Sequence, residues 1–455
     1  MKLYADSVLI GNQWQRDKTI TIDAQGIICA IDSGYGADAT KLQGALVPGM
    51  VNCHSHAFQR AFAGFSEYRA NSQDSFWSWR DIMYCFVAKM SPDDLYRVSR
   101  FLYLEMLRAG YTSVAEFHYL HHQPDGTAFT DPAEMSHQVI NAADSVGIAI
   151  THLPVLYSYA GFGEQTANPG QARFINTLDD YWQLVTALKG RYQNLDKVEF
   201  GVAPHSLRAV SKNQLDELVP LAKQLGQQTP LHIHIAEQTA EVDDCAAFYG
   251  ARPVEWLMDN FELQQNWCLI HATHLSAEEI GRLANTGAVV GVCPTTEANL
   301  GDGIFAAEEY LSAGGRIAIG SDSHIAINLA DEIRSLEYSQ RLKLRQRAVL
   351  SSPQQTSVGT HLYTHCAEAG ASTVNQKVGS IAIGKRADLV LLDSEQPTLY
   401  AKPLEFLLDA AIFACDKLPV KSVMVGGQWV LQDGEHLQQE AVKRDYLTVM
   451  KKLSS

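Results

Sequence analysis

Two histidines separated by one residue, His54 and His56, directly follow an apolar run at positions 47–51. Side chains alternate faces along a β-strand, so both imidazoles would point the same way, about 6.6 Å apart. Such a pair can bind one metal ion between its rings. The alternative is a pair of hydrogen-bonded histidines near a strand end. The motif alone leaves both interpretations open.

Histidines recur after later apolar runs, and 9 of the 16 in the chain fall in six short segments: 54–56, 116–119, 203–208, 232–237, 271–274 and 320–324. Histidines kept for stability alone would scatter over helices and loops. An open zinc site takes about three protein ligands, or four with a carboxylate. We predict His54, His56, His234 and Asp322 as this set. We prefer His234 to His232 because it lies nearer the carboxyl end of its strand, and we expect His232 to be a hydrogen-bonded core residue.

Two further residues have the chemistry for proton transfer near such a metal. Glu237 follows His234 by three residues and could take a proton from water and pass it to a leaving nitrogen. His271 ends the next apolar run and could orient or deprotonate the water, as could Asp322. The alternatives are a carboxylate that stabilises a helix start and a plain core histidine.

The elements that must position these residues alternate along the middle of the chain. Amphipathic stretches such as 92–108, 132–146, 179–192 and 212–225 separate apolar runs, a pattern that favours a parallel sheet with helical crossovers. We count eight candidate strands: 46–54, 112–117, 147–156, 198–204, 230–236, 267–272, 288–293 and 316–321. Eight such units predict a (β/α)8 TIM-type barrel, whose active site lies at the carboxyl ends of the strands. The polar segments fall at those ends.

The residues at both ends of the chain show a different sequence pattern from the middle. Short alternating segments joined by Gly and Asp fill residues 1–45, and similar segments return after residue 376. We predict a catalytic barrel over 46–375 and a small β-sandwich domain built from 1–45 and 376–455, which are the two chain termini.

The composition excludes several classes of function. The 455 residues carry a net charge of −15 and no basic run, which argues against nucleic acid and anionic membranes as partners. An anionic substrate would therefore need local arginines. The eight cysteines lack C-x-x-C spacing and predict reduced thiols. With no signal-like start and no 18-residue apolar span, we expect a cytoplasmic protein, and an apolar surface face could form a homodimer.

The order His-x-His, His, His, Asp over eight strands inside a split β-domain resembles the amidohydrolase superfamily. The opening 45–56 and the segment 379–393 are similar to its two recurring borders, so the resemblance spans nearly the whole chain. Binuclear members carry a bridging lysine at the end of the fourth strand, where this chain has Ala203-Pro204-His205. The resemblance therefore implies a mononuclear deaminase with one Zn²⁺ per subunit, although such ligands also accept iron or manganese.

A finer resemblance, carried by segments 54–64, 76–80, 116–119, 203–208 and 232–238, is to superfamily members that remove ammonia hydrolytically from a formimino-substituted dicarboxylate. The matching positions imply that Gln59, Arg80, Tyr119, His205 and Arg208 surround the substrate. Guanidinium groups can bind each carboxylate with two parallel hydrogen bonds. We expect Arg80 in an aromatic-rich loop, although either arginine could form a surface salt bridge instead. A deaminase of a purine such as guanine is the nearest alternative, and a non-catalytic scaffold is a remoter one.

Overall fold

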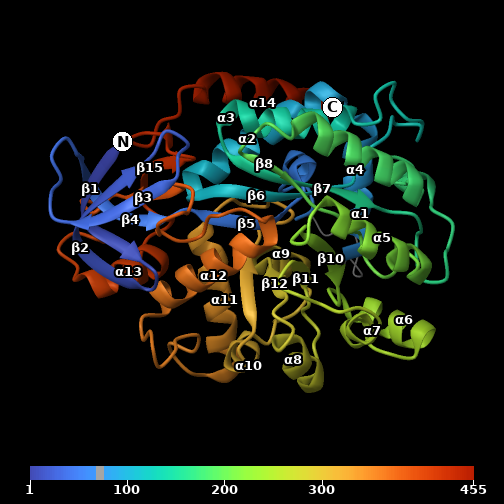
Figure 1. Ribbon diagram of the computed structural model, residues 1–455. Coiled ribbons are helices and arrows are strands. Elements are labelled where there is room, and N and C mark those ends of the chain that lie inside the picture. Colours follow the sequence, from blue (N-terminus) through green and yellow to red (C-terminus); the bar gives the residue numbers. More distant parts are fainter. Residues whose placement is uncertain (68–75, 455) are drawn as a thin grey trace.

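The computed structural model describes residues 1–67 and 76–454, and for residues 76–78 the backbone alone. Strands from the two ends of the chain form a single seven-stranded sheet in the order β16-β15-β14-β4-β1-β2-β3, at the left of Figure 1. Strand β4 pairs antiparallel with β14, so Val47 lies opposite Val390. The predicted β-structure from both termini is confirmed. Its strands are β1 (Lys2–Ile10), β2 (Gln13–Ile22), β3 (Ile28–Ser33), β4 (Thr40–Pro48), β14 (Leu389–Leu392), β15 (Val420–Val425) and β16 (Gln428–Leu431).

The other strands form the barrel, and their neighbouring pairs run parallel. One group has the order β5-β6-β7-β8, with β9 also paired to β7, and the other has the order β10-β11-β12-β13. Isolated bridges join the groups, Ser55 to Asp322 on one side, and Val202 to Leu231 and Ser206 to His234 on the other. The predicted barrel is therefore confirmed. Its strands are β5 (Met50–Ser55), β6 (Tyr111–His118), β7 (Ala149–Leu156), β8 (Val198–Phe200), β9 (Ala203–Pro204), β10 (Leu231–Ile235), β11 (Trp267–His271), β12 (Val289–Val292) and β13 (Arg316–Ile319).

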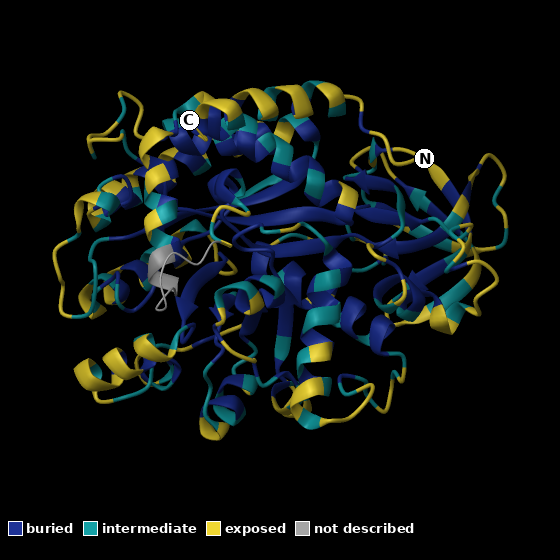
Figure 2. Ribbon diagram, turned by 180° about the vertical axis from the view of Figure 1, so that it is seen from behind, coloured by how far each residue is buried: buried dark blue, intermediate teal, exposed yellow. Residues whose placement is uncertain are grey.

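Helices surround the barrel, with their exposed residues on the outside, whereas the strands are buried (Figure 2). Every residue of β5, β6 and β7 is buried, as expected of parallel strands covered on both faces. No helix in the described residues is long and apolar enough to cross a lipid bilayer. The helices are α1 (Phe76–Lys89), α2 (Pro92–Ala109), α3 (Glu134–Val146), α4 (Leu178–Tyr192), α5 (Lys212–Leu225), α6 (Thr239–Tyr249), α7 (Pro253–Asn260), α8 (Ala277–Ala284), α9 (Pro294–Leu300), α10 (Ala307–Ser312), α11 (Leu329–Leu344), α12 (Val358–Val374), α13 (Leu407–Phe413) and α14 (Gln439–Leu453), with 3-10 turns at Ala57–Phe62, Pro169–Gln171 and Leu404–Phe406.

The first predicted barrel strand, 46–54, is two strands in the structure. Strand β4 ends at Pro48 in the terminal sheet, and β5 begins at Met50 in the barrel. Gly49 lies between them and donates its N–H to the carbonyl of Asp388. A Cβ atom at Gly49 would lie 2.2 Å from Oγ1 of Thr112, so only glycine lets the chain pass from one sheet to the other at this point. The apolar run continues across the break between the two strands, so the sequence pattern does not reveal where one strand ends and the next begins.

Three histidines are buried beside one another near the end of β6: His118 at its end, His121 just after it, and His152 on the neighbouring strand β7. This cluster predicts that the stability of the fold is sensitive to acid. Burial lowers the pKa of His121 and of His152 to about 3, and burial also holds the pKa of His118 well below its ordinary value. A base whose pKa is lower in the folded than in the unfolded state adds stability above its unfolded pKa, near 6.5, and loses it as the pH falls. We expect the free energy of unfolding to fall below pH 6.5 by about 1.4 kcal/mol per pH unit for each histidine.

Urea unfolding at several pH values, with wild type and His152→Leu in the same metal-loaded state, tests this expectation. His152 has no hydrogen-bond partner for either ring nitrogen within the described chain, so the variant removes one titrating group at little cost in hydrogen bonding. Its stability should fall less steeply with acid than that of wild type. Parallel pH dependences in the two proteins would contradict the assignment.

Candidate active site

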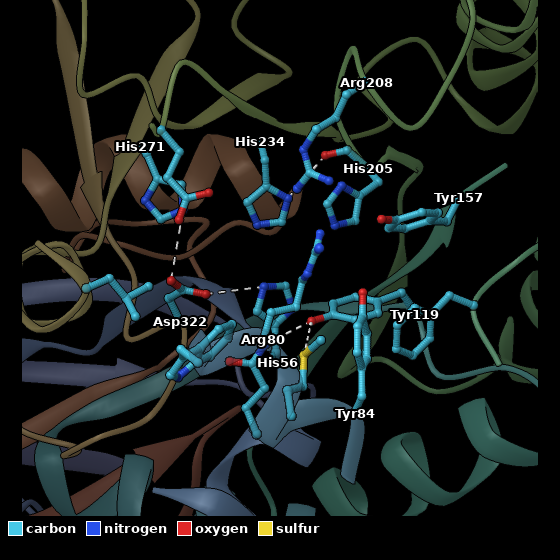
Figure 3. A pocket seen from close by; sticks show the side chains of 16 residues that line it. His56, Arg80, Tyr84, Tyr119, Tyr157, His205, Arg208, His234, His271 and Asp322 are labelled. Carbon is cyan, nitrogen blue, oxygen red and sulfur yellow. Dashed lines mark hydrogen bonds and ion pairs between the residues drawn. The ribbon is translucent and has the colours of Figure 1, made fainter. Parts of the chain in front are cut away.

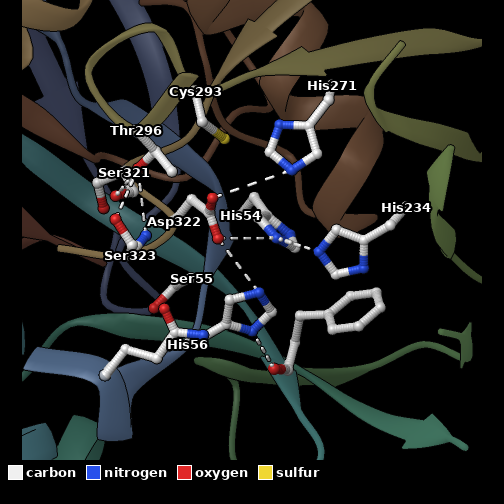
Figure 4. Close-up of polar contacts among 12 residues, drawn as sticks. His54, Ser55, His56, His234, His271, Cys293, Thr296, Ser321, Asp322 and Ser323 are labelled. Atoms are coloured by element: carbon white, nitrogen blue, oxygen red, sulfur yellow. Dashed lines mark hydrogen bonds and ion pairs between the residues drawn. The ribbon is translucent and has the colours of Figure 1, made fainter. Parts of the chain in front are cut away.

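The structure brings the four predicted metal ligands together at one end of the barrel (Figure 4). One ligand atom from each of His54, His56, His234 and Asp322 lies within 4.8 Å of the others. The Nε2 atoms of His54 and His234 are 3.0 Å apart. Asp322 Oδ1 lies 3.4 Å from Nε2 of His54 and 3.2 Å from Nε2 of His56. Tetrahedral zinc with bonds of about 2.0–2.1 Å separates its ligand atoms by about 3.4 Å, so these side chains fit such an ion.

Backbone carbonyls orient two of these imidazoles. Nδ1 of His56 lies 2.8 Å from the carbonyl oxygen of Phe117, and Nδ1 of His234 lies 3.1 Å from that of His205. A proton on each Nδ1 donates to its carbonyl and leaves the Nε2 lone pair for a cation. Burial and the neighbouring His56 lower the pKa of His54 to about 3, so its ring stays neutral, as a metal ligand must be.

Five non-glycine residues at the end of β11 and in the loops that follow β10, β11 and β13 adopt the left-handed backbone region. These residues are Ala236 (φ 52°), His271 (φ 68°), Ala272 (φ 46°), Asp322 (φ 42°) and His324 (φ 58°). Such conformations are unfavourable for residues with a Cβ atom, and strained residues tend to cluster at active sites. Asp322 is held by its N–H, which donates to the carbonyl of His54 across the barrel seam. With these backbone conformations, the side chains of His271 and Asp322 approach each other, and Nε2 of His271 lies 3.9 Å from Oδ2 of Asp322.

Glu237 and His271 lie beside the ligand set. Nε2 of His271 is 3.7 Å from Oε1 of Glu237 and 3.9 Å from Oδ2 of Asp322. Burial raises the pKa of Glu237. Burial alone would lower the pKa of His271, but Glu237, Glu297 and Asp322 outweigh it and raise this pKa to about 10. A divalent cation bound beside Asp322 would lower the pKa again, which would let Nε2 of His271 accept a proton. The arrangement can therefore hold and move protons next to a bound cation.

A cavity of about 560 Å³, including its open mouth, lies over these groups (Figure 3). Its lining includes Glu237 and His271 at one end and the two predicted guanidinium groups at the other. Both arginines face His205, whose pKa is lowered first by burial and then by Arg208, with a smaller effect of Arg80. All five residues predicted to contact substrate line this cavity: Gln59, Arg80, Tyr119, His205 and Arg208. No lysine is found among the described residues of the lining.

The prediction that Arg80 lies in a loop is wrong. Arg80 belongs to helix α1, whose side chains are described from Trp79 onward; those of Phe76, Trp77 and Ser78, part of the segment quoted above, lie outside the described residues. The helix carries Arg80 so that its guanidinium stands 5.7 Å from the ring centre of Tyr84 and reaches the cavity. The aromatic residues around Arg80 suggested irregular structure because their spacing is only weakly amphipathic.

Sequence reasoning missed Tyr157, which also lines the cavity. The amide of Gln171 donates to the Tyr157 hydroxyl at 2.8 Å, and the amide of Gln59 donates to the Tyr119 hydroxyl at the same distance. Each amide occupies an acceptor position of its hydroxyl. The Tyr119 hydroxyl in turn donates to Sδ of Met83 at 3.6 Å. Tyr157 directly follows β7, so its place at a strand end was a signal that could have found it.

A second missed residue, Glu116, supports the histidine pair. Its carboxylate accepts hydrogen bonds from Oγ of Ser55 at 2.6 Å, from the N–H of Ala57 at 2.7 Å and from the hydroxyl of Tyr103 at 3.0 Å. Burial raises the pKa of Glu116 to about 7. The sequence placed Glu116 at a strand end but gave no reason to connect it to residues 55–57.

Comparisons with known proteins agree with this geometry. A family model described as Amidohydrolase family matches residues 45–430. The chain is 45% identical over 452 residues, 99% of each sequence, to a formimidoylglutamate deiminase of Pseudomonas aeruginosa. A crystal structure of an amidohydrolase from Brucella melitensis superposes with a TM-score of 0.94 at 42% identity over the full length of both chains. A zinc-bound adenosine deaminase from Xanthomonas campestris, 21% identical with a TM-score of 0.80 over 100% of this chain and 98% of its own, shares the fold. The chain belongs to the amidohydrolase family.

Proposed function

We propose that this protein is a formimidoylglutamate deiminase, which hydrolyses N-formimino-L-glutamate to N-formyl-L-glutamate and ammonia in histidine degradation. The observation that carries the proposal is a single cavity with two guanidinium groups at one end and a metal-ligand set with Glu237 at the other. The substrate has a matching arrangement of groups, because its two carboxylates lie at one end and its formimino group at the other. The relative at 45% identity, named formimidoylglutamate deiminase, supports the same reaction.

We propose zinc as the metal in the site formed by His54, His56, His234 and Asp322. Three imidazoles and a carboxylate suit zinc, and the adenosine deaminase structure that shares this fold contains zinc. Bound there, the ion would act as a Lewis acid that generates hydroxide from water near neutral pH. Metal analysis of the purified protein should find one ion per chain and should distinguish zinc from iron or manganese.

The arginines bind the substrate carboxylates in this proposal. Arg208 and Arg80 reach the cavity from different elements, Arg208 from the turn after β9 and Arg80 from α1. A guanidinium can donate two parallel hydrogen bonds to a carboxylate. The rings of Tyr119 and His205 lie beside those of His56 and His234, with ring centres 5.0 and 4.9 Å apart. Gln59 donates to the Tyr119 hydroxyl, and all three residues line the cavity, where they can orient the chain of the substrate. A purine has no carboxylate for either guanidinium group to bind.

The side chains at the other end of the cavity move the protons. Asp322 and His271 accept a proton from the attacking water, whose oxygen forms a bond to the formimino carbon. Glu237 delivers a proton to the terminal formimino nitrogen, and the remaining proton of the new hydroxyl group passes by way of Asp322 to the same nitrogen. The bond between the carbon and this nitrogen then breaks and ammonia departs, while the glutamate nitrogen stays bonded to the carbon. The carbon keeps the water oxygen as the formyl carbonyl, so one water is consumed for each ammonia released. The raised pKa of buried Glu237 suits it to carry this proton.

Ammonia release separates the proposed substrate from its alternatives. The zinc-loaded protein should release ammonia from N-formimino-L-glutamate with kcat/KM at least about 10³-fold above that for guanine or 5-methylthioadenosine, because a neutral purine offers the two arginines no carboxylate. Faster release from either purine would overturn the proposed function. A homodimer and a cytoplasmic location stay predictions, and sedimentation of the pure protein would test the first.

A further inference from the structure

We propose that Glu297 is a positioning residue that fixes the ring of His271 for proton transfer. The proposal rests on the active site proposed above but assigns a group that neither the sequence motifs nor the mechanism used. Oε1 of Glu297 lies 3.3 Å from Nδ1 of His271. Both side chains are buried, with 5% of Glu297 and 1% of His271 exposed, so water does not replace this contact.

The position of Glu297 is itself fixed. Glu297 lies in the first turn of α9, and its Oε1 also accepts the N–H of Cys293 at 2.8 Å. Its own N–H donates to the carbonyl of Cys293, and its carbonyl accepts the N–H of Asp302. The N–H of Cys293 therefore holds the carboxylate, and two backbone hydrogen bonds hold the residue, before any substrate arrives, as preorganisation of the site requires.

The contact decides which nitrogen of His271 faces the reaction. With Nδ1 donating to Glu297, Nε2 is directed between Glu237 at 3.7 Å and Asp322 at 3.9 Å. The strained backbone of His271, at φ 68°, does not by itself fix its ring. Without Glu297, the proton could move to Nε2 or the ring could turn, and either change removes the acceptor that faces the water.

Two substitutions at Glu297 show whether His271 needs the hydrogen-bond acceptor or the negative charge of this side chain. Glu297→Gln keeps an oxygen that can accept from both Nδ1 of His271 and the N–H of Cys293, so it should retain most of the turnover. Glu297→Leu removes the acceptor and should lower kcat about 10- to 100-fold. KM should stay unchanged because Glu297 does not line the cavity. The matched control is Glu332→Leu, which removes an equally buried carboxylate that accepts from Thr295 of the same helix but does not reach His271.

A double-mutant cycle shows whether Glu297 acts through His271. In a His271→Asn background, Glu297→Leu should have no further effect on kcat. An equal loss in both backgrounds, or an equal loss in Glu332→Leu, would mean that Glu297 only supports the fold and would overturn the proposal. An unchanged kcat in Glu297→Leu would overturn it too.

A readout other than activity keeps this proposal separate from the proposed substrate. In protein labelled with ¹⁵N-histidine, the signal absent from His271→Asn identifies His271. Its Nδ1 should show the chemical shift of a protonated nitrogen in wild type and should change in Glu297→Leu but not in Glu332→Leu. An unchanged shift in Glu297→Leu would contradict the assignment, even if the protein proved inactive on N-formimino-L-glutamate, which would refute the proposed function alone.

Discussion

Glu237→Gln should lower kcat on N-formimino-L-glutamate by about 10³-fold, the largest effect we expect from a substitution that keeps the site intact. Glutamine has the same shape but cannot give a proton to the departing nitrogen. Glu237 is 8% exposed and lies 3.7 Å from Nε2 of His271, so bulk water does not readily replace it. Steady-state kinetics of ammonia release measures the loss.

The metal content of the Glu237 variant is the control. Glu237 lies outside the group formed by His54, His56, His234 and Asp322, so one ion per chain should remain bound. If the variant lost the metal, its lower turnover would be due to the missing ion and not to the missing carboxylate of Glu237. Turnover close to that of wild type, with the metal bound, would remove Glu237 from the mechanism.

Arg208→Met should lower kcat/KM by about 10²-fold, mainly through a higher KM, because a substrate carboxylate would enter the cavity without its cation. Burial alone would lower the pKa of Arg208, but Tyr157, Glu241 and Glu237 outweigh it, so the guanidinium stays charged inside the protein. Methionine keeps most of the side-chain volume, which limits the loss of packing. Initial rates over a range of substrate concentrations separate KM from kcat.

Arg208→Lys provides the matched comparison. Lysine keeps the charge but loses the two parallel donors, so its kcat/KM should fall between those of Met and Arg. N-formiminoglycine, which lacks the side-chain carboxylate, then identifies the partner of Arg208. If wild type and Arg208→Met differ little on this compound, Arg208 binds the side-chain carboxylate; if the full difference remains, it binds the α-carboxylate. An unaltered kcat/KM for N-formimino-L-glutamate in Arg208→Met would show that Arg208 binds neither.

Much of the fold could be predicted because its signals are local. Buried parallel strands produce apolar runs of fixed length, and amphipathic helices between them produce a separate period, so the barrel strands are visible one at a time. The clustering of histidines at the ends of these runs points to one end of the barrel. His234 and Asp322 lie 88 residues apart, yet their place at strand ends was enough to expect them in one site.

Features that depend on distant partners could not be predicted in this way. The break at Gly49 exists because Thr112 and Asp388 approach it from other parts of the chain. Arg80 lies on a helix although its neighbours are aromatic. The predicted domain boundaries at residues 45 and 376 stay predictions, although strand β4 of the terminal sheet continues to Pro48.

The sequence alone determined the barrel, its association with a sheet from both termini, and which residue types stand at the strand ends, because strand and helix periodicity are properties of neighbouring residues. The tertiary structure alone decided that Glu297 meets His271, that Gln171 orients Tyr157, and that Glu116 holds the turn after His54. These partners are 14 to 61 residues apart and meet only when the barrel closes. A polar residue shows its type in the sequence, but its hydrogen-bond partner is fixed by the packing of the whole fold.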